Sequence, residues 1–198
     1  MQAVLVSSAD EVAEGLIPRP VTVKTNGRKA RSLFERGQLT IRLATHEEAS
    51  DIASLTSEAF DGRGHFAKAG FENADEVEQL MEKGKFLLAE KDGHLVGFAY
   101  LDPRHEATRL ELLAVAPEQQ RTGIGSQLLY AAERLSCSMR CFFMHVRVMN
   151  LHWETVKFCR RRGYVEFGIE PLYGNQPLSA HCHIVRMCKQ LDVDRLAF

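Results

Sequence analysis

One stretch of the sequence, residues 109 to 135, constrains the fold more than any other. Residues 110 to 116 form a short and mostly apolar run, which predicts a buried strand. Pro117 ends that run, because proline cannot donate to the hydrogen-bond ladder of a sheet. A polar loop follows, and leucines and alanines then recur at helical spacing up to Leu135. The stretch therefore predicts a strand, a loop and a helix in direct succession.

The loop in this unit has the composition of an anion-binding turn. The first amides of a helix have no partner within the helix and carry the positive end of its dipole. Such amides bind anions, most often phosphate. Gly123 and Gly125 leave the backbone open to close approach and permit the unusual φ angles of such a turn. We therefore expect a phosphate-bearing cofactor at residues 120 to 126.

Two common glycine loops fit this segment badly. A P-loop requires lysine and then serine or threonine after its second glycine, whereas Gly125 is followed by Ser126 and Gln127. A dinucleotide-binding loop requires a third glycine, where this chain has Leu128, and an acidic residue about 20 positions further on. The strand-like residues 142 to 148 contain no carboxylate. A glycine-loop oxidoreductase is therefore a distant alternative.

A third loop type fits well. Residues Gln120 to Gly125 resemble the Gln/Arg-x-x-Gly-x-Gly/Ala signature of the GNAT N-acetyltransferase family. Residues 112 to 118 resemble the fourth strand and following turn of that family. Asn150 and residues 158 to 164 resemble its later asparagine and its Phe-Tyr-x-x-x-Gly-Phe segment, in the same order and spacing. The resemblance extends over about residues 39 to 190, the size of one domain.

This resemblance implies an α/β fold with a mixed, mostly antiparallel sheet that is flanked by helices and splayed at strands 4 and 5. We expect the family domain at residues 38–191 and a C-terminal tail at residues 192–198. Residues 1–37 fit the family poorly and are expected to form an N-terminal extension. Because residues 24 to 36 are basic, we expect a solvated arm, a contact with a second subunit, or a segment near the cofactor phosphates.

Local patterns place several elements of that domain. Thr45 and Glu48 predict a capping box at the start of a helix over residues 49 to 60. Asp92-Gly93 between apolar runs predicts a β-hairpin. Residues 103 to 107 are expected to be a loop, and Gly163 is expected to end a helix over residues 153 to 162.

The resemblance also implies acetyl-CoA as co-substrate and the transfer of an acetyl group to a primary amine. Leu113, Ala114 and Val115 would pair with the pantetheine arm as an extra strand does, and Asn150 would contact that arm. The pyrophosphate would be bound by the segment that consists of Gln120, Arg121, Thr122, Gly123, Ile124, Gly125 and Ser126. The other phosphate would meet Arg121 or one of the arginines 160 to 162, unless that arginine run is only a solvated helix end.

Two residues are candidates for proton transfer. Glu111 is one charged residue in an apolar strand, a costly position for a carboxylate without a purpose. It is either the base that takes the proton from the amine, as the matching glutamate in the family suggests, or a residue on an exposed strand face or the partner of an arginine such as Arg109. Cys159 stands where family members commonly carry the tyrosine that acts as acid, so it is either that acid or a packing residue.

Composition narrows the possible partners, the location and the cofactors of the protein. The net charge of −1 gives no bulk attraction to nucleic acid or to an anionic membrane. Five cysteines without paired spacing, and the lack of a long apolar run, favour a soluble cytoplasmic protein. The family resemblance also makes a homodimer plausible. We expect no metal site, because the His181-Cys182-His183 run lacks a second ligand pair. The acceptor is expected to be an amine of a small molecule or peptide, and the rival class is a CoA-binding regulatory or interaction protein without catalysis.

Overall fold

The structure is a computed structural model that describes residues 4–5, 32–36, 39–60, 71, 73–171 and 182–192, with backbone only at residues 4–5 and 32–36. Most of the expected extension and the tail beyond residue 192 lie outside the described residues, as does His181. The backbone of residues 32–36, which belong to the expected extension, pairs with the first strand of the expected domain.

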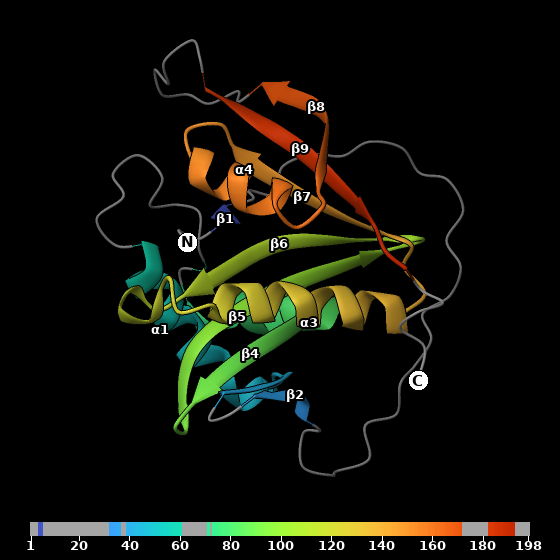
Figure 1. The fold of residues 1–198 in the computed structure, drawn as a ribbon. Coiled ribbons are helices and arrows are strands. Elements are labelled where there is room, and N and C mark those ends of the chain that lie inside the picture. The colour runs from blue at the N-terminus through green and yellow to red at the C-terminus, as the bar shows by residue number, and fades with distance from the viewer. Residues whose placement is uncertain are drawn as a thin grey trace.

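The described strands form one nine-stranded sheet (Figure 1). Its order is β2-β3-β4-β5-β6-β7-β9-β8, with β1 paired to β6. The strands are β1 (Val4–Leu5), β2 (Ser32–Arg36), β3 (Leu39–Leu43), β4 (Lys85–Lys91), β5 (His94–Arg104), β6 (Ala107–Val115), β7 (Phe143–Met149), β8 (Val165–Pro171) and β9 (His183–Gln190). All neighbours are antiparallel except β6 and β7, so the predicted mixed and mostly antiparallel sheet is confirmed.

The parallel pair β6 and β7 stays together over only half of its length. Residues Ala107 to Leu110 pair with Phe143 to Val146. Beyond that point β7 pairs only with β9, and β6 pairs with β5. The two strands therefore separate after Leu110, which confirms the predicted splay, and the freed edge of β6 meets β1 through Leu112 and Leu113.

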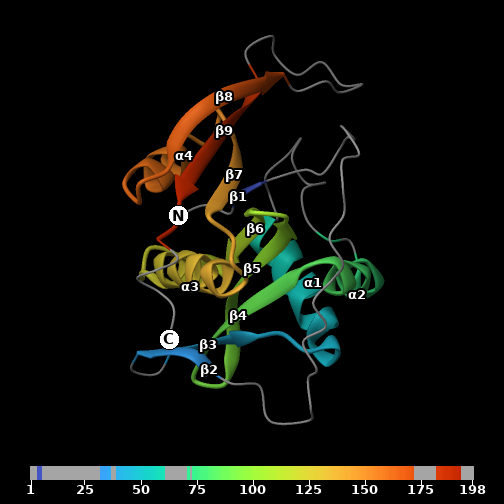
Figure 2. The same cartoon turned by 90° about the vertical axis from the view of Figure 1, so that its right-hand side faces the viewer.

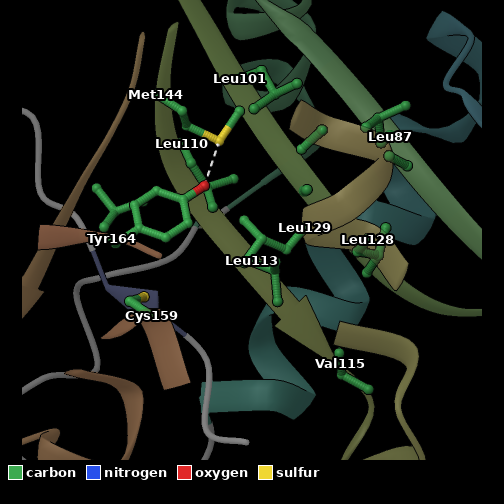
Figure 3. Close-up of a cluster of buried hydrophobic side chains, with 14 of the residues drawn as sticks. Leu87, Leu101, Leu110, Leu113, Val115, Leu128, Leu129, Met144, Cys159 and Tyr164 are labelled. Atoms are coloured by element: carbon green, nitrogen blue, oxygen red, sulfur yellow. Dashed lines mark hydrogen bonds between the residues drawn. The ribbon is translucent and has the colours of Figure 1, made fainter. Parts of the chain in front are cut away.

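Helices cover both faces of the sheet. Figure 2 shows α3 and α4 on one side and α1 and α2 on the other. The helices are α1 (Ala49–Phe60), α2 (Ala74–Lys83), α3 (Ile124–Ser138) and α4 (Trp153–Arg160), with short 3-10 turns η1 (His46–Glu48) and η3 (Pro117–Gln119). Each face of the sheet thus has its own apolar core. The core under α3 and α4 includes Leu113, Leu128 and Tyr164, and Figure 3 shows these side chains together.

The local patterns were mostly correct. Thr45 and Glu48 form the capping box ahead of α1, with the Thr45 amide 2.7 Å from Glu48 Oε2. Asp92 and Gly93 both have positive φ, at 53° and 79°, in the hairpin between β4 and β5. Gly163 ends the α4 region with a φ of 86°. The predicted loop at residues 103 to 107 is wrong, because β5 and β6 continue to a tight turn and Pro103 pairs with Thr108.

Candidate active site

The glycine loop between β6 and α3 is held in a defined shape by its own side chains. The Gln120 side-chain amide donates to the Val115 carbonyl at 3.1 Å, which ties the loop to the end of β6. The Thr122 hydroxyl donates to the Gln119 carbonyl at 2.7 Å. Gly123 is the N-cap of α3 with a φ of 97°, a conformation that strongly favours glycine. The sequence therefore determines both the turn and the helix start.

This shape leaves a run of backbone donors without partners. Within the described part of the chain, the amides of residues 121 to 125 have no hydrogen-bond acceptor, whereas those of Ser126 and Gln127 bond to the Gly123 carbonyl. Arg121 also has a positive φ, at 64°, so the loop alternates its backbone orientation as anion-binding nests do. A phosphate at this helix N-terminus would satisfy these donors.

A third glycine that sequence reasoning missed brings the helix close to the sheet. Gly97 lies in β5, and a Cβ atom there would be 2.9 Å from the Ala114 carbonyl oxygen and 3.1 Å from Leu128 Cδ1. A side chain at this position would push β6 or α3 away. Gly97 therefore allows the N-terminal half of α3 to pack against the strands that end at the loop. It is a lone glycine inside a strand pattern, which is the available sequence signal for a close approach.

A pocket opens where the glycine loop faces α4. Its walls are the end of β6, the loop, and the residues that follow α4. The lining residues are Val115, Gln119, Gln120, Arg121, Gly123, Gly125, Ser126, Phe158, Arg161 and Arg162. The pocket thus combines backbone donors with three arginines and one aromatic ring.

The structure separates the members of the arginine run 160 to 162. Arg160 forms an ion pair with Glu166 outside the pocket. The guanidinium of Arg162 lies 3.6 Å from the centre of the Phe158 ring and donates to the Ser126 hydroxyl. Burial lowers the pKa of Arg162 below its ordinary value. Arg161 and Arg162 are therefore the members of the run that can meet an anion in the pocket.

The freed edge of β6 lies next to this pocket. Leu113, Ala114 and Val115 are buried, and Val115 is common to the strand and the pocket wall. Asn150, just after β7, uses its side-chain oxygen to accept from the His183 amide at 3.0 Å, so it ties β7 to β9. The two strands that splay are thus each held on their outer side by a neighbouring strand.

Glu111 lies at an irregularity in β6. Tyr100 pairs with Leu112 and Leu101 pairs with Leu110, so Glu111 is the extra residue of a β-bulge. Its Oε2 atom is buried and has no hydrogen-bond partner among the described residues. Burial raises the pKa of the Glu111 carboxyl above its ordinary value of 4.5, although nearby Arg109 acts in the opposite direction. Within the part of the chain that the structure describes, the carboxyl has no ion pair, and its raised pKa favours acceptance of a proton.

Two polar residues of β5 accompany Glu111, and the sequence reasoning did not single them out. Tyr100 and Asp102 are both buried. Burial and the negative charges of Asp102 and Glu111 raise the pKa of Tyr100 to about 12. Asp102 pairs with Arg104 at 2.7 Å. The sequence signal for these residues was weak, because only the pairing of β5 with β6 brings them beside the bulge.

Cys159 has the surroundings of a core residue. Its side chain lies among the apolar residues under α3 and α4, in the cluster that also holds Tyr164 (Figure 3). The residue is 2% exposed, and burial raises the pKa of its thiol to about 12. A thiol in this environment releases its proton less readily than an ordinary cysteine.

The described part of the chain contains no helix that is long and apolar enough to span a membrane.

Comparison with known proteins agrees with this geometry. Residues 82–166 match the family model described as an acetyltransferase (GNAT) domain. A ribosomal-protein-alanine N-acetyltransferase from Brucella melitensis has a similar fold, with a TM-score of 0.65 at 20% identity, over 76% of this chain and 99% of that one. No curated protein sequence matches the chain.

Two further solved structures have the same fold. Ard1 from Thermoplasma volcanium gives a TM-score of 0.64 at 20% identity, over 78% of this chain and 98% of that one. A GNAT family acetyltransferase from Elizabethkingia anophelis, solved with acetyl-CoA bound, gives a TM-score of 0.61 at 17% identity, over 79% of this chain and 100% of that one. The family model over residues 82–166 and the similar folds confirm the resemblance to the GNAT acetyltransferase family that the sequence showed.

Proposed function

We propose that the chain is an acetyl-CoA-dependent N-acetyltransferase that moves an acetyl group directly to a primary amine. One observation carries this proposal: a loop of unpartnered amides opens beside the edge of β6 that β7 leaves beyond Leu110. The unpartnered amides suit the phosphates of a cofactor, and the strand edge suits a pantetheine arm that pairs with it. The related fold from Elizabethkingia anophelis holds acetyl-CoA, which supports the same co-substrate here.

The residues of the pocket fit such a co-substrate. The segment from Gln120 to Ser126 would hold the pyrophosphate through the free amides. Arg161 and Arg162 would meet the remaining phosphate, since guanidinium groups match phosphate oxygens well. Asn150 would contact the arm from the end of β7.

The arm would pair with Leu113, Ala114 and Val115. Leu112 and Leu113 already pair with Val4–Leu5 of β1 on this edge. A backbone edge accepts one neighbour at a time, so the arm and β1 compete for part of it. We therefore expect the bound state to require that β1 leaves Leu113.

Glu111 would act as the base. When bound, acetyl-CoA supplies an activated acetyl thioester. An alkylamine has a pKa near 10 and is mostly protonated at neutral pH, so it must lose a proton before it attacks. The raised pKa of Glu111 and its unpartnered oxygen suit it to take that proton. The backbone amide of Val115 would polarise the carbonyl, and the leaving thiolate would take its proton from solvent.

Cys159 is therefore not required as the acid in this scheme. Its burial and the raised pKa of its thiol favour a packing role. The same observation favours a second candidate function, in which the chain binds CoA as a regulatory or interaction protein and has lost catalysis.

Three finer features complete the proposal. The acceptor would be an amine of a small molecule or a peptide.

All five cysteines are free thiols, which supports a reducing compartment such as the cytoplasm. The strand β8 has only β9 as a neighbour within the described residues and exposes Val165 and Ile169, so a homodimer would be built there.

A thiol-release assay with a panel of amines separates the two candidate functions. Wild-type protein and Cys159→Ala are incubated with acetyl-CoA and each amine. Amine-dependent release of free thiol, retained in Cys159→Ala, is the expected result. Binding of acetyl-CoA without release for any amine would instead favour the non-catalytic alternative. Loss of release in a folded Cys159→Ala protein would restore the acid role of Cys159.

A further inference from the structure

One face of the sheet beside Glu111 carries a row of cationic and titratable side chains. Arg109 of β6 lies opposite His145 of β7 in the parallel pair. Arg147 of β7 lies opposite Arg186 of β9 in the antiparallel pair. Directly paired residues project to the same face, and so do His145 and Arg147, which lie two residues apart in β7. The four side chains therefore share one face across three strands, and we call them the row.

The carboxylates of this face neutralise only part of the row. Asp102 pairs with Arg104, and Glu170 pairs with Arg147 at 2.5 Å. Within the described residues, neither Arg109 nor Arg186 takes part in an ion pair, and both are exposed. The guanidinium groups of Arg109 and Arg186 therefore have no ion-pair partner among the described residues, although Arg109 lies near enough to act on the Glu111 carboxyl.

Both of these arginines act on His145. Burial, then Arg109, then Arg186 lower the pKa of His145 below its ordinary value of 6.5. The imidazole is therefore neutral at physiological pH and adds no charge of its own. The guanidinium groups of Arg109 and Arg186 thus act on the His145 ring from the two strands on either side of β7.

An aromatic wall stands next to the row. The Phe167 ring centre of β8 lies 5.5 Å from that of His145, and the Arg186 guanidinium lies 4.6 Å from the Phe167 ring centre. Phe167 is 48% exposed, so its outer surface is free to contact a ligand. The site thus offers unpaired positive charge, an apolar surface and a carboxyl base on one face.

We propose that the acceptor is an amine that also carries a carboxylate, bound between Arg109 and Arg186 with its apolar part on Phe167. This inference rests on the proposed function, because it places the amine at Glu111. A zwitterionic acceptor matches the face at both ends, since its amine meets the carboxyl and its carboxylate meets the arginines. Arginine binds carboxylate through two parallel hydrogen bonds, which would also orient the amine. A purely cationic acceptor would be repelled by the same row.

The test uses two probes that have no amine and need no acetyl-CoA. N-acetyl-L-phenylalanine has the carboxylate and the ring, and N-acetyl-L-phenylalaninamide has the ring alone. Dissociation constants are measured by titration, and the pKa of His145 is followed by NMR with His145→Gln as the assignment control. We expect the carboxylate probe to bind about tenfold tighter, the usual value of one charged hydrogen bond. It should also raise the pKa of His145, because its charge offsets that of the arginines.

Variants test whether Arg109 and Arg186 cause the difference in affinity between the two probes. Arg109→Gln and Arg186→Gln should each remove most of the difference between the probes, whereas Arg140→Gln, an exposed arginine in the turn after α3, should not. Equal binding of the two probes, binding of neither, or an unmoved pKa of His145 would overturn the proposal. Acetyl-CoA binding is measured on the same proteins. Its loss would reject the proposed function, whereas its retention with equal probe binding would reject only the anionic acceptor.

Discussion

The two halves of the candidate site are built in different ways. The cofactor half consists mainly of consecutive residues, from Val115 to Ser126, whose backbone amides we propose to bind the phosphates, with Arg161 and Arg162 added from beyond α4. The acceptor half is made by side chains from β5, β6, β7, β8 and β9 that meet only through strand pairing. A contiguous backbone motif can be recognised in a sequence, whereas a constellation spread over five strands cannot.

The largest effect is expected from a variant that disables only the acceptor half of the candidate site. Glu111→Gln removes the proposed base, and general-base catalysis is typically worth about 10²–10⁴-fold. We expect acetyl transfer to fall within that range while acetyl-CoA binding is unchanged, because Glu111 does not line the cofactor pocket. Steady-state kinetics with a titration of acetyl-CoA check both quantities. Unchanged turnover would remove Glu111 from the mechanism and leave the cofactor half intact.

A smaller effect is expected in the cofactor half. Arg162→Gln removes a guanidinium that lies in the pocket and bonds to Ser126. A lost charged hydrogen bond of about 1.5–3 kcal/mol weakens acetyl-CoA binding by roughly tenfold or more. Arg160→Gln is the matched control, since Arg160 pairs with Glu166 outside the pocket. Equal weakening in the two variants would mean that only overall charge matters.

The pH dependence of stability tests the environment of Glu111. Burial raises the pKa of Glu111 in the folded chain, so the folded protein holds this proton more tightly than the unfolded chain does. The stability associated with it is complete below the ordinary pKa of 4.5 and is lost as the pH rises through the raised value. Glu111→Gln should therefore be more stable than wild type at pH 8, by about 1.4 kcal/mol for each unit by which burial raises this pKa.

Thermal unfolding at both ends of the pH range measures this difference. Near pH 4 the carboxyl is mostly protonated in the folded protein, so the two proteins should unfold at similar temperatures. A variant that is less stable than wild type at pH 8 would show that the Glu111 carboxylate has a stabilising partner.

The smallest effect concerns the competition at the edge of β6. Proline cannot donate to a strand ladder, so the double variant Val4→Pro/Leu5→Pro should release β1 from Leu112 and Leu113. We expect acetyl-CoA to bind a few-fold more tightly, because a contact of two residues is weak. Isothermal titration of the variant against wild type gives the ratio. Weaker binding in the variant would indicate that β1 supports the site and does not compete for it.

Much of the fold followed from short-range patterns. The capping box at Thr45 and the hairpin at Asp92-Gly93 each depend on residues within one turn, so the sequence sufficed. The free amides and positive φ of the loop at Gly123 were expected for the same reason. The end of β5 was placed too early, because Pro103 lies where a sequence pattern indicates a loop while pairing with Thr108 extends the strand.

The acceptor half depended on information that no short pattern holds. The register shift that makes Glu111 an extra residue is a property of two strands, not one. Arg109, His145 and Arg186 become neighbours only when β6, β7 and β9 are aligned. Cys159 was ambiguous in the sequence because a helical cysteine suits a core or a site equally, and its burial beside Tyr164 was decided by how α4 packs.

The central claim is that the glycine loop holds the phosphates of acetyl-CoA. Thermal unfolding of the full chain with acetyl-CoA, CoA, NAD and ATP in parallel tests it most directly. A ligand that binds only the native state stabilises it by about 2.7 kcal/mol at 100 times its dissociation constant. We predict a clear rise in unfolding temperature with acetyl-CoA and CoA and none of that size with NAD or ATP. No rise with acetyl-CoA, or a larger rise with NAD, would contradict the assignment of the loop and the mechanism built on it.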